Sequence, residues 1–213
     1  FVPVPAADGG HEDSPDRGDR DVRFCYVGQL SARKGVDHLA RALDDLPATD
    51  WRIDVIGDGP LGVVFERSSA TTRSRIRRSP FVPHAEALAR ISAADVLVLP
   101  SRWDGWGVVV NEALMRGVRV ICSDACGASV LVRSEQQGRV FPARSVIGLT
   151  RALREEIARG RPSTDERAAL RAWSRCITPE AAAAYLDAIV TQPGARPTPP
   201  WLQRGVVGAG SPS

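Results

Sequence analysis

The chain has 213 residues, 43% of them hydrophobic, which is enough to build the core of one ordinary α/β domain and leaves little room for a second. Its 28 Lys and Arg residues and 25 Asp and Glu residues give a formal charge of +3, so the sequence lacks the concentrated positive field of a nucleic-acid-binding protein. Neither a signal-peptide pattern nor an apolar run of the ~18 residues that cross a bilayer is found, so we expect at most peripheral contact with a membrane.

The two ends of the chain are predicted to lie outside the folded domain. Residues 1–21 are assigned to a flexible linker, because after the first few positions they offer almost no large apolar side chain to bury. Residues 192–213 are dominated by Pro, Gly and Ser and are assigned to a tail. The domain is therefore placed at residues 22–191. Because the chain begins at Phe1 without an initiator methionine, we also expect it to be a fragment of a longer protein.

Short apolar runs alternate with helical patterns along this domain. Runs at residues 23–27, 51–56, 95–99, 118–122 and 138–141 have the length and composition of β-strands. Apolar residues at helical spacing follow the first and the last of these runs; they are Val36, Leu39, Ala40, Leu43 and Leu46, then Val146, Leu149, Ala152 and Leu153. Such alternation predicts a single Rossmann-like α/β domain with a parallel sheet and flanking helices.

Two more helices are predicted to close the domain. Ser163 and Glu166 have the spacing of a capping box, and Thr178 followed by Pro179 has the form of an N-cap with a proline in the first turn.

The cysteines and histidines suggest no metal site. Cys25, Cys122, Cys126 and Cys176 lie in or beside apolar segments without the density of a disulfide framework, which fits a reducing compartment, so we expect a cytoplasmic protein. Cys122 and Cys126 are expected to be small buried residues rather than zinc ligands. The histidines, His11, His38 and His84, are scattered away from any cluster at ligand spacing.

Three loops that follow predicted strands are candidates for ligand binding, since ligands of doubly wound sheets bind at the carboxyl ends of the strands. The first, residues 28–35, contains two glycines and the adjacent cations Arg33 and Lys34; it could bind phosphate or simply be a solvated surface. The second, residues 57–60, reads Gly-Asp-Gly-Pro and could be a plain turn.

The third loop, within residues 100–114, is the most informative. Gly105 and Gly107 bracket an expected helix start, where free backbone N–H groups favour a diphosphate. Asp104 and Glu112 flank that position, and carboxylates accept hydrogen bonds from the paired hydroxyls of sugars and ribose. Together these features predict a nucleotide-sugar site.

The third loop resembles the E-x7-E signature of retaining glycosyltransferases with the GT-B fold, of the family 4 or group 1 type. Further segments resemble the family's motifs in the family's order. Residues 26–37 are similar to its first phosphate loop, residues 56–60 to its Gly-(Glu/Asp)-Gly-Pro turn, residues 81–84 to the strand that meets the nucleotide base, and residues 120–124 to the strand after the signature. The resemblance covers about residues 23–188 and implies the C-terminal, donor-binding half of such an enzyme.

The resemblance also implies roles for individual residues. Lys34 would contact the diphosphate, Asp104 the hydroxyls of the transferred sugar, and Glu112 the ribose. The other substrate-binding residues would be Gly28, Gln29, Arg33, Gly57, Phe81, Val82, Gly105, Trp106, Gly107 and Val108. Two positions depart from the family pattern: Gln29 stands where many members carry a second phosphate-binding arginine, and Asp104 replaces the first glutamate of the signature.

The implied activity is transfer of a hexose from a UDP- or GDP-sugar to an acceptor with retention of configuration, without a metal ion or another cofactor. The acceptor would be held by an N-terminal domain or a partner chain, so the isolated chain would bind a donor without transferring the sugar. A sugar-nucleotide epimerase or a phosphorylase on the same fold is an alternative, and so is a non-catalytic nucleotide-sugar-binding module that pairs with a partner chain. An NAD-dependent dehydrogenase is disfavoured, because no G-x-G-x-x-G follows the first strand.

Two further groups of residues allow more than one interpretation. The dense basic run of Arg73, Arg75, Arg77 and Arg78 is expected to be a solvated helix end or turn, with contact to acidic lipid or acceptor phosphate as the alternative. Trp103 and Trp106 could face an acceptor or pack beside the glycines, whereas Trp51 and Trp173 are expected to pack in the core or between helices.

Overall fold

The computed structural model describes residues 20–191 and 197–202. The predicted linker at residues 1–21 and tail at residues 192–213 therefore lie largely outside the described residues. In the described part, no helix is long and apolar enough to cross a membrane.

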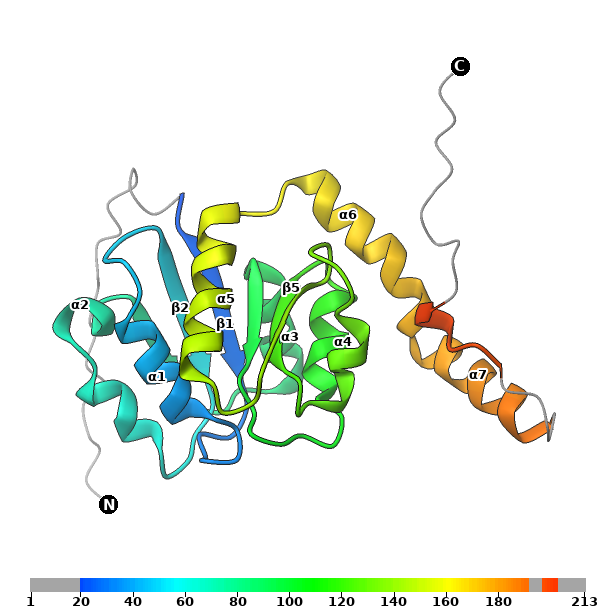
Figure 1. The fold of residues 1–213 in the computed structure, drawn as a ribbon, viewed down its shortest axis with the longest axis horizontal. Helices are drawn as coiled ribbons and strands as arrows, with labels where there is room; N and C mark the ends of the chain where they lie inside the picture. Colours follow the sequence, from blue (N-terminus) through cyan, green and yellow to red (C-terminus); the bar gives the residue numbers. More distant parts are fainter. Residues whose placement is uncertain (1–19, 192–196, 203–213) are drawn as a thin grey trace, which may run out of the picture.

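A single parallel sheet forms the centre of the domain, as the sequence predicts (Figure 1). Its strands are β1 (Val22–Val27), β2 (Trp51–Ile56), β3 (Ile76–Ser79), β4 (Val96–Leu99), β5 (Arg119–Ser123) and β6 (Gly138–Phe141). All neighbours pair in parallel, in the order β3-β2-β1-β4-β5-β6. The five strands predicted from sequence are confirmed to within one residue at each end.

The strand β3 corrects two interpretations of the sequence. The basic run is not a helix end or turn throughout, because Arg77 and Arg78 belong to this edge strand and pair with β2, although both remain exposed. Residues 81–84 are not a strand: residues 81–83 are irregular and His84 begins helix α3 (His84–Ala93). Pro80 and Pro83 have no N–H group to donate to a sheet, which explains why the pairing stops at Ser79.

Helices cover both faces of the sheet (Figure 1). Besides α3, they are α1 (Val36–Asp44), α2 (Ala70–Arg73), α4 (Val108–Leu114), α5 (Val146–Arg159), α6 (Thr164–Trp173) and α7 (Pro179–Thr191), with 3-10 turns η1 (Gly62–Arg67), η2 (Gly127–Leu131), η3 (Ser174–Ile177) and η4 (Pro200–Leu202). Every chain connection between paired strands in this arrangement crosses over the sheet, since parallel neighbours cannot be joined by a hairpin.

Alternate strand residues supply two separate cores. One core joins Phe24 and Tyr26 of β1 to α1 and α5, including the apolar stripes predicted for these two helices. The other joins Cys25 and neighbouring strand residues to α3, α4 and α6. Cys25, Cys122 and Cys126 are free and buried, as expected, and burial raises the pKa of each thiol. Trp51 is fully buried and Trp173 packs against the second core, which confirms both predictions.

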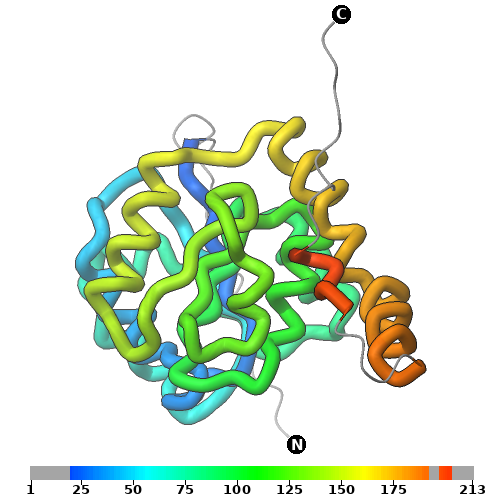
Figure 2. Tube along the Cα trace, turned by 45° about the vertical axis from the view of Figure 1, so that its right-hand side comes forward, coloured from blue at the N-terminus to red at the C-terminus, as the bar shows by residue number. Residues whose placement is uncertain are grey.

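The last two helices begin as predicted. Ser163 and Glu166 form a complete capping box at the start of α6, and the Thr178 hydroxyl accepts a hydrogen bond from the Ala181 N–H (3.3 Å) in the first turn of α7. Helix α7 projects from the rest of the domain (Figure 2) and has no buried residue. Trp201 of η4 packs edge-on against Tyr185 of α7, with ring centroids 5.9 Å apart.

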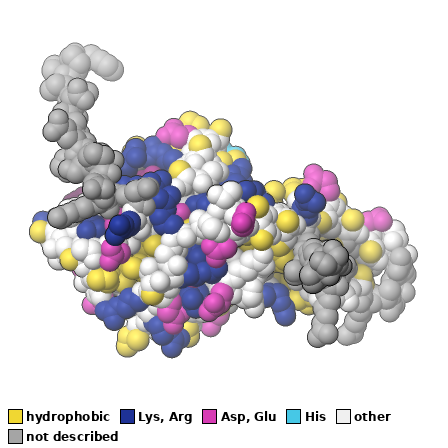
Figure 3. Space-filling model, turned by 90° about the horizontal axis from the view of Figure 1, so that it is seen from above, with side chains coloured by type: hydrophobic (Ala, Val, Ile, Leu, Met, Phe, Trp, Pro, Cys, Tyr) yellow, Lys and Arg dark blue, Asp and Glu magenta, His cyan; other side chains and the backbone are white. Residues whose placement is uncertain are grey.

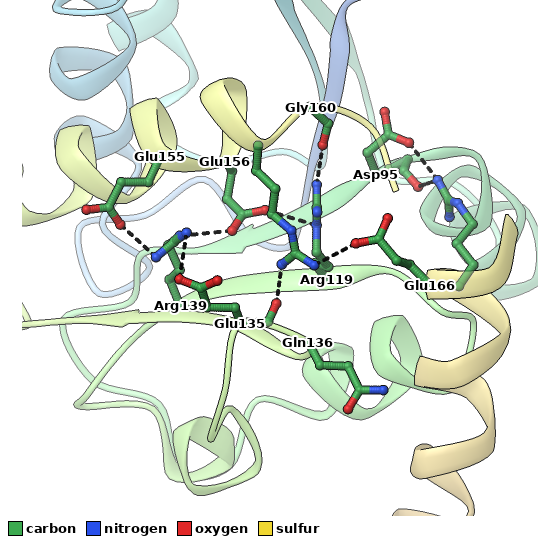
Figure 4. Close-up of polar contacts among 12 residues, drawn as sticks. Asp95, Arg119, Glu135, Gln136, Arg139, Glu155, Glu156, Gly160 and Glu166 are labelled. Carbon is green, nitrogen blue, oxygen red and sulfur yellow. Dashed lines mark hydrogen bonds and ion pairs between the residues drawn. The ribbon is translucent and has the colours of Figure 1, made fainter. Parts of the chain in front are cut away.

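The amino-terminal edge of the sheet carries a network of ion pairs. Seen from above, basic and acidic side chains intermingle there (Figure 3). At the centre, Arg119 lies 2.9 Å from Glu156, and both side chains are almost completely buried (Figure 4). Arg139 also pairs with Glu156 (2.9 Å), and burial lowers the pKa of the Arg119 guanidinium. The charges here compensate one another, at the opposite end of the strands from the three candidate loops.

Candidate functional site

The order of the strands in the sheet indicates where a ligand crevice is expected. The chain leaves β1 toward α1 on one face of the sheet and leaves β4 toward α4 on the other face, and β1 and β4 are neighbours. In doubly wound sheets, the loops that diverge from such a switch point form a crevice at the carboxyl ends of the strands. The two loops here are residues 28–35 and residues 100–107, the first and third candidates from the sequence.

The first loop fits tightly against the third. Gly35 adopts a left-handed conformation (φ 69°), and a Cβ atom at this position would lie 2.0 Å from the carbonyl oxygen of Pro100. Only glycine allows that approach. Gln29 and Arg33 are exposed, whereas Lys34 is half-buried and turned toward the third loop.

The second loop, residues 57–60, braces the first. The Leu30 N–H donates to the Asp58 carbonyl (2.8 Å), and the Leu61 N–H donates to the Leu30 carbonyl (3.0 Å). The backbones of Gly57 and Gly28 touch, since a Cβ atom on Gly57 would lie 2.0 Å from the Gly28 oxygen. This segment is therefore more than a plain turn: it supports the first loop from behind.

The third loop holds Asp104 in a fixed place. The Asp104 N–H donates to the Ala125 carbonyl (3.0 Å), and the Asp104 carbonyl accepts from the Gly127 N–H (3.1 Å). Three positions on, Gly107 is left-handed (φ 86°) and packed so closely that a Cβ atom would lie 2.6 Å from Cys126 Sγ. These contacts fix the backbone on both sides of Gly105 and Trp106.

Unpaired backbone donors gather in this loop. Among the described residues, the N–H groups of Gly105, Trp106, Gly107 and Val108 donate to no protein acceptor. Gly105 faces open space, because the nearest atom to an added Cβ would be 4.0 Å away. Exposed, uncompensated N–H groups of this kind can bind the oxygens of an anion.

Lys34 and Asp104 meet beside these donors. The Lys34 ammonium lies 2.5 Å from Asp104 Oδ2, and the two side chains are only 16% and 11% exposed. Ser101 donates a longer hydrogen bond to the same oxygen (3.4 Å). The structure thus brings together two of the three predicted catalytic residues, 70 positions apart in the sequence.

Glu112 contacts a residue that the sequence did not connect with it. Its Oε1 lies 2.8 Å from Nε2 of His84, the first residue of α3. The histidine is 72% exposed and the glutamate 23%, so the carboxylate is steadied from the solvent side.

The two tryptophans of the third loop differ in their surroundings. The Trp106 indole donates to Asn111 Oδ1 (2.8 Å), which ties its ring to α4 although the residue remains exposed. Trp103 is 62% exposed.

The residues expected near the nucleotide base come from the loop after β3. The Phe81 N–H donates to Asp58 Oδ2 (2.9 Å), so the second loop also holds this one. Phe81 is 60% exposed and Val82 is half-buried. An exposed aromatic ring beside the crevice offers a face on which a base could stack.

Arg102 is the main residue that the sequence analysis missed. Its backbone N–H donates to the Arg33 carbonyl (2.8 Å), and its guanidinium donates to the Ala32 carbonyl (3.0 Å) and to Asp37 (2.6 Å). It thereby fastens the third loop to the first. Its charge also contributes, after burial as the main cause, to lowering the pKa of His38. Its only signal in the sequence was its position next to the signature.

A groove away from the three loops is a second hollow in the described part of the chain. A groove of about 500 Å³ runs along α5 and is lined by Asp45, Ile147, Thr150, Arg151, Arg154, Glu155 and Ala158. None of these residues belongs to the three loops. We place the candidate site at the switch point, because Lys34, Asp104 and the unpaired N–H groups of the third loop lie there and not in this groove.

Comparison with known proteins identifies the family of the chain. The family model for glycosyl transferases group 1 matches residues 11–171, about three quarters of the chain. The chain belongs to the group 1 glycosyltransferases.

This group 1 chain is 34% identical over 134 residues to the putative teichuronic acid biosynthesis glycosyltransferase TuaC of Bacillus subtilis, covering 63% of the chain and 31% of TuaC. It is 29% identical over 185 residues to a GDP-mannose-dependent α-(1-6)-phosphatidylinositol monomannoside mannosyltransferase of Mycolicibacterium smegmatis, covering 82% and 48%. The matched part of the chain therefore spans 31% to 48% of the length of these curated relatives.

Solved structures of the family share the fold. The C-terminal domain of the group 1 glycosyltransferase LpcC from Francisella tularensis superposes with a TM-score of 0.56 at 18% identity, covering 68% of this chain and 78% of that domain. The chain thus has the architecture of a C-terminal GT-B domain.

Proposed function

We propose that this chain is the donor-binding half of a retaining hexosyltransferase, which holds a nucleoside-diphosphate sugar while another segment or a partner chain holds the acceptor. The observation that carries the proposal is the position of the Lys34 ammonium beside four unpaired N–H groups, at the point where β1 and β4 diverge. A diphosphate is the ligand that this combination suits best.

The same arrangement suits sugar transfer. When the bond between the sugar and the diphosphate breaks, negative charge grows on the leaving phosphate. Fixed N–H groups and a lysine stabilise that charge without having to reorganise, because the loop is already braced by Ala125, Gly127 and Arg102.

Glu112 is proposed to accept hydrogen bonds from the ribose hydroxyls. One of its oxygens is taken by His84, which leaves the other for a ligand. Phe81 and Val82 would then flank the base. The mannosyltransferase relative is named for GDP-mannose, which supports a nucleotide-sugar donor and leaves UDP- and GDP-sugars as the candidates.

The acceptor-binding half is part of the proposal. Helix α7 carries Leu186, Ile189 and Val190 with 60%, 41% and 76% of their surface exposed. A helix with so much unburied apolar surface fits contact with another domain or chain. A non-catalytic donor-binding module that works only through a partner chain is the second candidate, favoured by the same exposed helix.

Isothermal titration of the purified chain with UDP- and GDP-sugars tests the proposal. Lys34→Ala and Glu112→Ala should each weaken binding of the preferred donor by about 1.5–3 kcal/mol, roughly tenfold to a hundredfold, because each removes a hydrogen bond that involves a charged group. Arg151→Ala, on the exposed side of α5, is the matched control and should leave affinity unchanged. Unaltered binding in both site variants would refute the assignment.

Joining an acceptor half would separate the two candidate functions. A transferase should then release nucleoside diphosphate in proportion to glycosylated acceptor, with the anomeric configuration of the donor retained in the product. A binding module should retain its affinity for the donor and release no nucleoside diphosphate.

A further inference from the structure

We infer that His84 is a positioning residue for the ribose of the donor: it holds the Glu112 carboxylate so that this group can accept hydrogen bonds from the ribose hydroxyls. The inference rests on the proposed function and deepens it, because it adds a second side chain to the ribose site. It starts from the contact of 2.8 Å between His84 Nε2 and Glu112 Oε1, which joins the first residue of α3 to α4.

The Glu112 carboxylate has no other hydrogen bond among the described residues. Arg116, one turn further along α4, donates to the backbone carbonyl of Glu112 (2.9 Å) and not to its carboxylate. The glutamate side chain is 23% exposed, so without His84 it could rotate about its side-chain torsions. Fixing such a long side chain costs conformational entropy, and the contact with His84 reduces the part of that cost that falls on ligand binding.

His84 itself comes from an anchored position. The preceding Pro83 has a restricted φ (−53°), and its carbonyl accepts the Ala87 N–H (3.0 Å) in the first turn of α3. Ala87 and Ile91 are buried and hold α3 against the domain. The imidazole therefore approaches Glu112 from a fixed backbone, although 72% of the His84 side chain is exposed.

The direction of the hydrogen bond leaves Glu112 suited to hydroxyl groups. A carboxylate only accepts, so Nε2 of His84 carries the proton and donates it. Oε2 of Glu112 then remains as an acceptor for a ribose hydroxyl, whose O–H is a donor. Because His84 acts through this carboxylate, its removal should lower the affinity only for nucleotides that have ribose hydroxyls.

The test is a titration of the full chain with UDP and GDP, and with the 2′,3′-dideoxy analogue of each. His84→Ala should weaken binding of the preferred ribonucleotide by about threefold to tenfold and leave the affinity for its dideoxy analogue unchanged. His84→Gln, whose side-chain N–H can replace the Nε2 donor, should recover most of the loss. In a Glu112→Ala background, His84→Ala should have no further effect.

Glu86→Gln is the matched control in the same turn of α3. The Glu86 carboxylate pairs with Arg90 (2.6 Å), so this variant should bind both ribonucleotides as the parent chain does. Thermal unfolding of each variant checks that the fold is retained.

The outcomes separate this inference from the proposed function. If His84→Ala lowers the affinities for the ribonucleotide and its dideoxy analogue by the same factor, His84 acts on the base, the phosphates or the fold, and the inference is wrong. It is also wrong if His84→Ala causes a further loss in the Glu112→Ala background, or if Glu112→Ala weakens binding and His84→Ala does not. If the unsubstituted chain binds neither UDP nor GDP, the proposed function itself fails.

Discussion

Replacement of Gly107 by alanine should destabilise the domain, because two independent costs meet at this position. Gly107 is left-handed (φ 86°), a conformation that costs an L-residue about 1–2 kcal/mol. An added Cβ atom would also lie 2.6 Å from Cys126 Sγ and 2.9 Å from Leu99 Cδ2, and both neighbours are buried. Overpacking of this kind typically costs about 1–3 kcal/mol.

The combined cost for Gly107→Ala is about 3 kcal/mol, which for a domain of this size corresponds to a fall in melting temperature of about 6–12 °C. Gly105→Ala is the matched control two positions away. Its Cβ would meet no atom closer than 4.0 Å, so the change in stability should stay within about 0.5 kcal/mol.

Urea unfolding of the two variants and the parent chain measures these differences directly. A third variant, Cys126→Ala, separates the two costs: in its background the Gly107→Ala penalty should shrink by about 1 kcal/mol, because the closest overpacked atom is gone. Equal stability of the two alanine variants would refute the packing argument. A penalty that does not change in the Cys126→Ala background would leave backbone conformation and the Leu99 contact as its causes.

Three other predictions concern the charged residues. Arg119→Ala should cost about 3–5 kcal/mol in urea unfolding, because it removes one of the two arginines that pair with the buried Glu156, whereas Arg151→Ala on the exposed side of α5 should cost less than about 0.5 kcal/mol. Backbone and arginine contacts hold the pKa of Glu166 below its usual range, so its contribution to stability is complete above the pKa of an unfolded glutamate and is lost as pH falls below about 4.5; melting curves of Glu166→Gln should lack that pH-dependent part. Arg102→Gln should raise the pKa of His38 in an NMR titration by removing a neighbouring positive charge, and should weaken donor binding because the first and third loops come apart; an unchanged histidine titration would contradict the contact.

Sequence patterns were sufficient for the parts of the fold that have strong periodicity. The strands at residues 51–56 and 138–141 were predicted at their observed bounds, and the stripes of α1 and α5 face the core as expected. Strand β3 was missed for a physical reason. Its sequence, Ile-Arg-Arg-Ser, lies at the sheet edge and buries little on either face, so it lacks the apolar alternation that identifies a strand.

The candidate site also has features that the sequence predicts and contacts that it does not. The glycines of the third loop and the acids that flank it are local features, and a single segment displays them. The pairing of Lys34 with Asp104 joins residues 70 positions apart, and it depends on β1 and β4 being neighbours. The contact between His84 and Glu112 likewise depends on where α3 begins, which the expected strand at residues 81–84 concealed.

Two side-chain contacts within the site leave its backbone donors for a ligand. Lys34 pairs with Asp104, and Glu112 contacts His84. The N–H groups of residues 105–108 donate to no protein acceptor among the described residues. A diphosphate that settles on them gains their full interaction and can share the Lys34 ammonium with Asp104. Hydrogen bonds from Asp104 and Arg102 already hold the loop in place, so binding a diphosphate costs little free energy for ordering the chain. Donors that are fixed in advance are what a site for a departing diphosphate requires.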